Sequence, residues 1–344
     1  MSPPTITAVI PTFRRPKLLR RAIESVLAQT HAELVVAVFD NHSEDETAAV
    51  VAELAARDPR VRYHCHARNL GAVANFQAGM DAVETPWFSF LSDDDVLLPG
   101  FYEHAIEQLA AHPRARFFCG QTLIWDPHSG QYETIPTKHW SSGHYEAGQA
   151  VGKMVRGHFT WTSTLWAREV RSSAGPLLEQ AVTDLPFQAR AAAVFPFVVS
   201  MKPLSIFTSH AAGASRQMSV ADYEDSFQRC KNWCTALAGL DEDVRRRIEH
   251  GFEDVLIRWL SRMLRLTFRQ QSWAEFDRAA RLLGEHGALR GRNALLARMA
   301  RLRTKRPMLY RLLRRASLLR HDKRAGRAAL PTARSLEQLL ERYS

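Results

Sequence analysis

Three consecutive aspartates, Asp93, Asp94 and Asp95, carry the clearest chemical signal in this sequence. They directly follow the apolar run 87–91, and three like charges at the end of a buried strand are costly unless a cation neutralises them. Their oxygens suit Mg²⁺ or Mn²⁺, and such an ion takes its remaining ligands from substrate phosphates. The alternative is a solvated acidic turn with a helix cap at Pro99. Taken alone, the three residues leave both interpretations open.

Two other polar segments follow apolar runs. Asp40 and Asn41 end the run 34–39, where a carboxylate can accept a hydrogen bond from a nucleobase or simply cap the next helix. Further along, a compact turn of Arg68, Asn69 and Gly71 offers a cation and free amides to a phosphate-bearing ligand. The sequence contains no GxGxxG and no Walker lysine, which argues against dinucleotide and P-loop binding.

Alternating apolar runs and amphipathic segments position these residues. We expect strands at 6–10, 34–39, 61–65 and 87–91, separated by helices that begin near Pro16, Ser43 and Val73. This order, with nearly continuous apolar strands, predicts an α/β fold with a parallel sheet covered by helices on both faces. In such sheets ligands bind outside the carboxyl ends of the strands, where the polar residues described above gather.

The same residues lie in four segments that resemble, in order and spacing, the nucleotide-sugar half of inverting glycosyltransferase family 2, which has the GT-A fold. The segments are AVIPTFRRPKLLRRAIESVLAQT, VVAVFDNHSED, RNLGAVANFQAGM and FLSDDDVLLPGF. The resemblance is close over about 5–115 and weak to about 216. It implies a mainly parallel central sheet in a catalytic domain over 1–215, with a nucleotide-sugar half (1–120) and an acceptor-side half (121–215). A helical, basic region over 216–344 follows.

The resemblance also implies roles for single residues. Thr12 and Asp40 correspond to the base-binding pair and Arg68 to the arginine beside the base and phosphates. The DxD-like motif, which contacts ribose and metal, corresponds to Asp93 and Asp94. Residues implied to contact the nucleotide sugar are Pro11, Thr12, Arg14, Asp40, Asn41, Arg68, Asn69, Gly71, Asn75 and Asp93, and those implied to hold Mg²⁺ or Mn²⁺ are Asp94, Asp95 and His210. Ser92 stands where many relatives have an aspartate.

The catalytic base implied by the family is Asp184, in the segment AVTDLPFQARAAA. An inverting transfer needs one carboxylate within reach of the acceptor hydroxyl. As an isolated aspartate before Leu185, the same residue fits a helix N-cap equally well. His210 resembles the family's histidine near the metal, although the arginine common two residues earlier in relatives is replaced by Thr208.

The segment 121–176 shows a weaker pattern, and we expect it to be rich in loops; 194–206 is again strand-like. Its tryptophans include Trp140, Trp161 and Trp166. These rings could stack on sugars in an acceptor cleft, or they could belong to the core, and the sequence leaves both open.

Composition sets outer limits. The chain has 344 residues, 46% of them hydrophobic, which excludes a disordered chain. No apolar run approaches the roughly 18 residues that span a bilayer, and the N-terminus has no signal-peptide pattern. Four cysteines without a CxxC pair favour a reducing cytoplasm and argue against a structural zinc site.

The net charge of +10 is unevenly distributed. Residues 1–218 hold 19 basic and 21 acidic side chains, whereas 219–344 hold 27 and 15. Within 286–334 there are 15 basic side chains and one acid, and 308–320 has the pattern of an arginine-rich amphipathic helix. Such a segment suits an anionic membrane surface or a helix packed on the catalytic domain, and we hold both open. Nucleic-acid binding is not expected, because no recognised motif accompanies the charge.

The sequence thus favours a metal-dependent, inverting glycosyltransferase that takes a nucleotide-diphosphate sugar, with a UDP-sugar preferred. We expect it to transfer to a glycan or lipid-linked sugar in cell-surface polysaccharide or glycan synthesis, in the cytoplasm or peripherally on the inner face of the membrane. Two alternatives are a nucleotidyltransferase on a similar sheet and a catalytically silent homologue acting as a basic scaffold.

Overall fold

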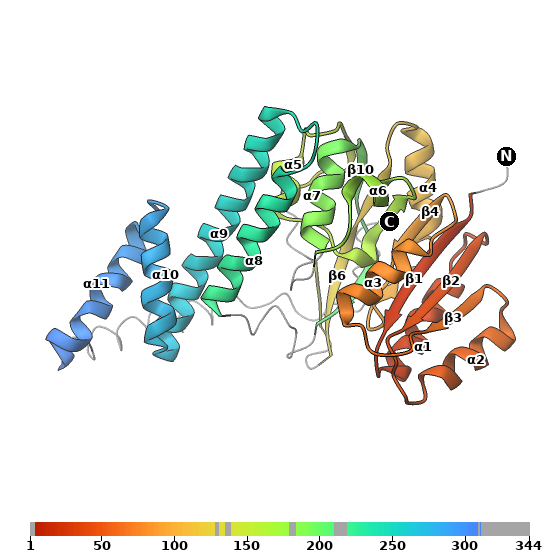
Figure 1. Cartoon of the computed structure of the whole chain (residues 1–344), viewed down its shortest axis with the longest axis horizontal. Helices are drawn as coiled ribbons and strands as arrows, with labels where there is room; N and C mark the ends of the chain where they lie inside the picture. Colours follow the sequence, from red (N-terminus) through yellow and green to blue (C-terminus); the bar gives the residue numbers. More distant parts are fainter. Residues whose placement is uncertain are drawn as a thin grey trace.

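The computed structural model of the chain describes residues 4–127, 131–134, 139–178, 184–209, 219–308 and 310. An α/β part carries the N-terminal elements, and paired helices extend away from it (Figure 1). In the described residues ten strands form one sheet, whose main path runs β3-β2-β1-β4-β9-β6-β10-β5.

The N-terminal half of the sheet has the predicted parallel arrangement. Its strands are β1 (Ile6–Thr12), β2 (Leu34–Asp40), β3 (Val61–Cys65) and β4 (Trp87–Phe90), and they alternate with α1 (Pro16–Leu27), α2 (Thr47–Arg57) and α3 (Ala72–Asp81). The register of β1 and β2 pairs Thr12 with Asp40, so the ends of both strands lie side by side. The sequence prediction is confirmed here: β1, β2 and β4 are nearly continuous apolar runs, and β3 is the edge strand, of which only Val61 is buried.

The other half of the sheet corrects the prediction of a loop-rich segment. Between 96 and 208 the chain forms β5 (Val96–Leu97), α4 (Phe101–Ala111), β6 (Phe117–Asp126), β7 (Gln131–Thr134), β8 (Gly143–Tyr145), α5 (Val151–Arg156), the 3₁₀ helix η1 (Trp161–Ser163), β9 (Thr164–Ala167), α6 (Val170–Ala174), α7 (Asp184–Val194) and β10 (Phe197–Thr208). The short β9 lies inside the sheet, antiparallel to both β4 and β6. Elements this short have no extended periodicity, and their pairing partners are distant in sequence, so the pattern alone does not show them.

The run 194–206 also differs from expectation at its start. Val194 is the last residue of α7, and the strand begins only at Phe197, after Pro196. A proline has no backbone N–H to donate, which is consistent with a boundary between helix and strand at this point.

Helices cover both faces of the sheet. One apolar cluster joins α1, α2 and α4 to residues such as Ile10 and Val36, and a second joins α3, α5, α6 and α7 to residues such as Val9 and Phe90. The alternation of side chains along the strands explains the division, because neighbouring residues Val9 and Ile10 point to opposite faces. The sheet is therefore fixed from both sides, and its carboxyl edge is a rigid platform.

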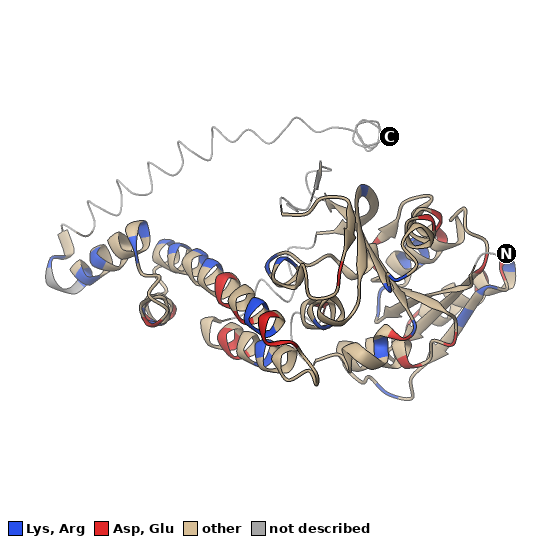
Figure 2. Ribbon diagram, turned by 90° about the horizontal axis from the view of Figure 1, so that it is seen from above, with Lys and Arg blue, Asp and Glu red and all other residues tan. Residues whose placement is uncertain are grey.

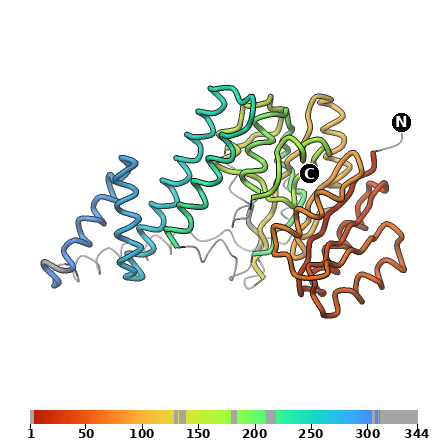
Figure 3. The backbone as a smooth tube through the Cα atoms, in the orientation of Figure 1, coloured from red at the N-terminus to blue at the C-terminus, as the bar shows by residue number. Residues whose placement is uncertain are grey.

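Among the described residues after the sheet are four long helices, namely α8 (Val220–Thr235), α9 (Glu242–Gln270), α10 (Trp273–Glu285) and α11 (Gly291–Lys305). Along the tube in Figure 3, α8 and α9 lie between the α/β part and the pair α10 and α11. The first half of α9 shares an apolar cluster with α5, α7 and α8, whereas its second half packs against α10 and α11. The predicted boundary near 216 falls in 210–218, outside the described residues. None of the described helices is both long and apolar enough to cross a membrane.

Candidate active site

A cleft of about 530 Å³ opens at the carboxyl ends of β1, β2 and β4. It is lined by Pro11, Thr12, Phe13, Arg15, Asn41, Asn69, Gly71, Ala72, Asn75, Phe76, Ser92, Asp93, Asp94 and Phe207. The four sequence segments singled out above therefore meet in one place. A cleft of this size suits a small-molecule ligand or cofactor.

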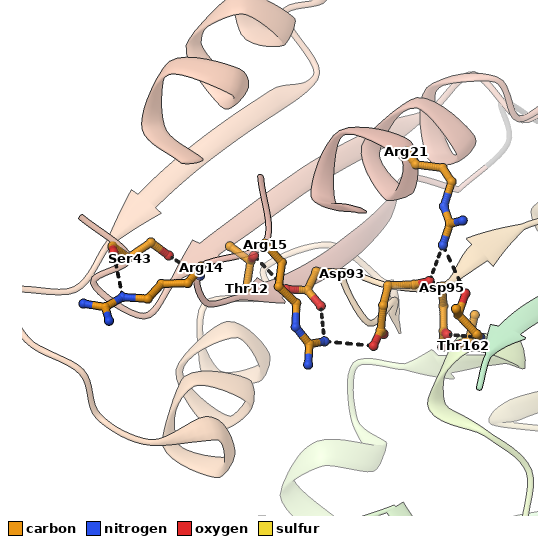
Figure 4. Close-up of polar contacts among 10 residues, drawn as sticks. Thr12, Arg14, Arg15, Arg21, Ser43, Asp93, Asp95 and Thr162 are labelled. Atoms are coloured by element: carbon orange, nitrogen blue, oxygen red, sulfur yellow. Dashed lines mark hydrogen bonds and ion pairs between the residues drawn. The ribbon is translucent and has the colours of Figure 1, made fainter. Parts of the chain in front are cut away.

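Arginines from the start of α1 hold the acidic motif (Figure 4). The Arg15 guanidinium donates to Asp93 Oδ1 at 3.1 Å and to Asp94 Oδ2 at 2.8 Å, and the Thr12 hydroxyl donates to Asp93 Oδ2 at 2.8 Å. Burial raises the pKa of Asp93, and the Arg15 charge opposes that rise. Arg15 therefore supplies the positive charge that the sequence analysis assigned to a metal alone.

Asp95 lies behind the other two aspartates and away from the cleft. It is buried, its Oδ1 accepts the backbone N–H of Thr208 at 2.9 Å, and its Oδ2 accepts the Thr162 hydroxyl. Burial, followed by the nearby Asp94 charge, raises the pKa of Asp95 to about 8. Asp95 therefore ionises less readily than a free aspartate, and its internal hydrogen bonds rather than solvent stabilise it.

Arg21 fixes the backbone of the same motif to β10. Its guanidinium donates to the Asp94 carbonyl at 2.5 Å and to the Thr208 hydroxyl at 3.0 Å, and that hydroxyl donates to the same carbonyl. Thr208, which replaces the arginine common in relatives, is thus used to join β10 to the acidic turn. This network sets the direction in which Asp93 and Asp94 face the cleft.

Asp40 is held by its own neighbours at the end of β2. Its Oδ1 accepts from the Ser43 N–H at 3.0 Å and the Ser43 hydroxyl at 2.5 Å, and its Oδ2 accepts from the Tyr63 hydroxyl at 2.6 Å. Burial and this hydrogen bond raise the pKa of Tyr63. The alternative in which these residues cap the next helix is not supported, because α2 begins only at Thr47 and no side chain caps it.

Asparagines connect the turn after β3 to the end of β2. Asn41 donates to Asn69 Oδ1 at 2.9 Å and accepts the Leu70 N–H at 2.7 Å. Asn75, at the start of α3, donates to the carbonyl of Phe39 at 2.9 Å. Gly71 has a φ of 87°, a conformation that a side chain at this position would strain. The turn thus has a fixed shape at the rim of the cleft.

Asp184 is the first residue of α7, and its partner is a histidine that sequence reasoning missed. His158 Nε2 lies 3.3 Å from Asp184 Oδ1, which also accepts the Leu185 N–H at 3.0 Å. Burial is the largest influence and lowers the pKa of His158, but the charge of Asp184 and the hydrogen bond to it together outweigh burial and raise the histidine pKa. The helix-cap interpretation and the role of a base are compatible, because the other oxygen of Asp184 has no part in these contacts.

One stretch of chain connects Asp184 to the acidic motif. His158 is followed by Phe159, whose backbone N–H and carbonyl both bond to the buried Gln188 side chain of α7, at 3.0 and 2.7 Å. Three residues later Thr162 donates to Asp95. The segment 158–162 therefore ties α7 to the cleft.

A profile of glycosyl transferase family 2 matches residues 7–172 of this chain. Residues 7–172 form a glycosyl transferase family 2 domain. The resemblance seen in the sequence is thereby confirmed. Two curated relatives are a GalNAc(5)-diNAcBac-PP-undecaprenol beta-1,3-glucosyltransferase of Campylobacter jejuni, 36% identical over 28% of this chain, and the succinoglycan biosynthesis protein ExoO of Rhizobium meliloti, 37% identical over 31%. The matched segments span 32% and 30% of those relatives.

Solved structures confirm the GT-A fold. Staphylococcus aureus TarS 1–349 in complex with UDP-GlcNAc has a TM-score of 0.63 at 14% identity, covering 87% of this chain and 85% of that one. The mannosyltransferase PcManGT from Pyrobaculum calidifontis, in complex with GDP-Man and Mn²⁺, has a TM-score of 0.53 at 14% identity, covering 90% and 83%. At this identity the likeness concerns the fold.

Several sequence-predicted residues of the family 2 domain lie away from the cleft lining. Arg68 is exposed, and its part in donor binding stays a prediction. Arg14 has a φ of 55° and donates from its backbone N–H and Nε to Ser43, at 2.8 and 3.1 Å. His210, predicted near the metal, falls outside the described residues.

The three tryptophans belong to the core rather than to an acceptor surface. Trp140, Trp161 and Trp166 are all buried, and Trp161 packs against Phe90 and Phe187 with ring centroids 4.8 and 5.3 Å apart. The aromatic residues that line the cleft are Phe13, 37% exposed, Phe207, 39% exposed, and the half-buried Phe76 of α3. Sequence reasoning missed Phe13 and Phe207 because each lies at the end of an apolar strand and is typical of one.

The donor set fits a divalent ion held by few protein ligands. Asp94 lines the cleft with a side chain that is 15% exposed, and Asp93 lies beside it. Asp95 uses both oxygens in internal contacts. Among the described residues no cluster of three or more acidic, histidine or cysteine side chains could hold a metal ion. This arrangement suits Mg²⁺ or Mn²⁺, which keep water and substrate oxygens as ligands, better than an ion enclosed by protein.

Proposed function

We propose that the family 2 domain transfers a sugar from a nucleotide-diphosphate donor to an acceptor hydroxyl, with inversion at the anomeric carbon. The observation that carries the proposal is the single cleft in which Thr12, Asn41, Asn69 and Asp93 meet. These residues come from three strand ends and one turn, and they match the segments that carry the family resemblance. The TarS complex with UDP-GlcNAc supports a UDP-sugar as the first donor to test.

In this proposal the donor lies along the cleft from β2 to the acidic motif. Thr12 and Asn41 contact the nucleoside, and the turn Asn69–Gly71 borders the phosphates with its backbone amides. Asp40 is buried and is held in one orientation by Ser43 and Tyr63, so in this proposal it fixes the end of β2 on which Asn41 faces the cleft. Ordering of this kind lowers the entropic cost of recognising a flexible ligand.

Asp94, with Asp93 beside it, would hold Mg²⁺ or Mn²⁺. The PcManGT complex with GDP-Man and Mn²⁺ supports this part of the proposal. Such an ion supplies Lewis-acid stabilisation of the diphosphate leaving group. Arg15 contacts the same two carboxylates and is 48% exposed, so it can move toward a phosphate when a ligand enters. Asp95 and Arg21 hold the motif in place from behind.

Asp184 serves as the base. It removes the proton of the acceptor hydroxyl as that oxygen forms a bond to the anomeric carbon, and the bond from this carbon to the diphosphate oxygen breaks. The nucleoside diphosphate leaves with the bonding electron pair, and no covalent intermediate forms on the protein. His158 orients the carboxylate through Asp184 Oδ1.

We further propose a glycan or lipid-linked sugar as acceptor, for cell-surface polysaccharide or glycan synthesis at the cytoplasmic side of the membrane. The names of the C. jejuni and R. meliloti relatives support this class of acceptor. In this proposal the exposed rings of Phe13 and Phe207, which line the cleft, contact the apolar face of the acceptor sugar.

The test is a transfer assay with UDP-, GDP- and dTDP-sugars, Mn²⁺ and lipid-linked sugar acceptors. Release of a nucleoside diphosphate and an inverted anomeric signal by NMR are expected. Asp94→Ala and Asp184→Asn should both abolish transfer, while Asp225→Asn, which changes an exposed carboxylate of α8, should not. Release of pyrophosphate would identify a nucleotidyltransferase. Transfer that survives both cleft substitutions would refute the assigned mechanism.

A further inference from the structure

The long helix α9 is divided by charge. Its first half, 242–254, mixes five acidic side chains with Arg245, Arg246 and Arg247, whereas every charged residue from 255 to 270 is an arginine. Figure 2 shows the acidic end beside the α/β part and the basic end next to α11. Over 255–308 the chain has 13 basic and three acidic side chains. The basic character therefore begins well before 286, within a helix that the sequence analysis did not single out.

Four arginines of α9 and α11 form a cluster, which we call the arginine cluster: Arg262, Arg265, Arg269 and Arg292. A hydrogen bond of 2.8 Å from Asn293 to the Ser261 hydroxyl holds α11 against α9 at this point. Partial burial, followed by the charges of Arg292, Arg269 and Arg262, lowers the pKa of Arg265. The packing of the two helices thus brings like charges together.

Two of the three acids in 255–308 have partners outside the arginine cluster. Arg303 pairs with Asp277 at 2.6 Å, and the Glu275 carboxylate accepts the Val220 N–H at 2.6 Å. The third acid of 255–308 is Glu285, at the end of α10. Like charges held together in this way are destabilising, so the arginine cluster costs the fold stability rather than contributing to it. Such a cluster is explained better by an anionic partner than by folding.

Exposed aliphatic side chains lie within the same surface. Leu266, 38% exposed, stands between Arg265 and Arg269 on α9, and Leu295, 57% exposed, is one turn after Arg292 on α11. Both helices have enough buried residues for their packing, so these leucines are additional apolar surface. Arginines around exposed leucines are the combination found on helices that lie on membranes, where the charges meet headgroups and the apolar groups enter the interface.

We infer that the arginine cluster, with Leu266 and Leu295, is a docking surface for the headgroup phosphates of an anionic phospholipid bilayer. This goes beyond sugar transfer, and it assigns membrane contact to a folded helical surface outside the predicted 308–320 helix. A single-stranded nucleic acid is the less favoured partner, because the exposed apolar groups of this surface are aliphatic and offer no stacking platform.

The test uses the full chain and vesicles of phosphatidylcholine with or without 30% phosphatidylglycerol, roughly the anionic content of a bacterial surface. We expect sedimentation with the anionic vesicles alone, and a strong decrease of binding with added salt. Arg262→Gln with Arg292→Gln should lower the partition coefficient roughly 30-fold, since each basic side chain near such a surface contributes about a fivefold factor. Leu295→Ser should lower it severalfold.

The matched control is Arg246→Gln with Arg281→Gln, which removes two exposed arginines of α9 and α10 outside the arginine cluster. This control should change binding much less. Both double variants should keep the circular dichroism spectrum and the transfer rate of the wild type on a water-soluble acceptor. Equal partitioning of the two double variants would overturn the inference, as would wild-type binding to single-stranded RNA without binding to vesicles.

Discussion

Two groups of arginines have opposite surroundings in this protein, those beside the cleft and those of the arginine cluster. In the α/β part, Arg15 bridges Asp93 and Asp94, and Arg21 donates to the backbone of the same turn. In the helical part, Arg265 lies among three other arginines, whose charges disfavour its own. In the first half the charges are paired and fixed within a cleft, whereas in the second half like charges gather on an exposed surface.

This difference fits two separate roles, sugar transfer in the cleft and contact with a membrane at the arginine cluster. A cleft that handles a diphosphate needs charges at defined positions, which requires partners that restrain each side chain. A surface that meets lipid headgroups needs charge density but no single geometry. The net charge of +10 is a sum over both regions, so it describes neither the paired charges of the cleft nor the excess of arginines on the helices. Single substitutions should therefore cause losses in the cleft and little or no loss in the arginine cluster.

The largest effect is expected for Asp184→Asn. Removing a general base should reduce kcat about 10²- to 10⁴-fold while leaving the KM for the donor nearly unchanged, because Asp184 contacts the acceptor rather than the nucleotide. Steady-state kinetics with varied donor and acceptor would measure this. A rise in the donor KM with an unchanged kcat would show that Asp184 contributes to donor binding and not to catalysis.

Arg15→Ala should destabilise the fold by about 1–2 kcal/mol, since it leaves the buried Asp93 without its charged partner; the exposure of Arg15 limits the effect. Chemical denaturation of the wild type and variant would measure it. Adding Asp94→Asn to Arg15→Ala should recover part of the loss by removing one of the two neighbouring carboxylate charges that Arg15 bridged. If the double variant is less stable than Arg15→Ala, repulsion between the acids is not the cause.

His158→Gln should give a pH-dependent loss of stability. The pKa of His158 is raised in the folded state, so its stabilising contact with Asp184 is fully present below the unfolded value of about 6.5 and disappears as pH rises through the folded pKa. The variant should therefore lose more stability at pH 6 than at pH 9, measured as the difference in Tm from the wild type. A constant difference would show that His158 acts by packing instead.

Arg265→Gln should have the smallest effect and the opposite sign. Removing one of four neighbouring arginines relieves repulsion, so stability should be unchanged or rise by up to about 0.5 kcal/mol. Denaturation at low and high salt would test the cause, since salt should diminish the gain. A clear loss of stability would show that the helical arginines are paired as those of the cleft are.

The sequence was sufficient for the first half of the sheet and not for the second. Strands β1 to β4 are local apolar runs joined by amphipathic helices, so pattern alone locates them. Strand β9 has four residues, and its place between β4 and β6 depends on contacts with segments about 50 to 80 residues away. Trp166 lies in β9 and Trp161 in the preceding η1, and both are buried because β9 lies inside the sheet.

The candidate site could likewise be predicted only in part, because residues that are distant in sequence meet there. Its acids were visible because three consecutive aspartates are unusual after an apolar strand, but their partners were not. Arg15 could have been found, since it precedes Pro16 at the start of α1 and so lies at the carboxyl edge of the sheet. His158 carries no such signal, because only the packing of α7 against 158–162 brings it to Asp184.

The central claim is that the cleft of the family 2 domain binds a nucleoside diphosphate through Asp94 and a divalent ion. Isothermal titration of UDP and GDP into the full chain, with Mn²⁺ and then with EDTA, tests it most directly. We predict metal-dependent binding of one of them at one site, lost in Asp94→Ala and unchanged in the Arg262→Gln, Arg292→Gln double variant. Binding that persists in Asp94→Ala, or that is lost when the arginine cluster is changed, would contradict it.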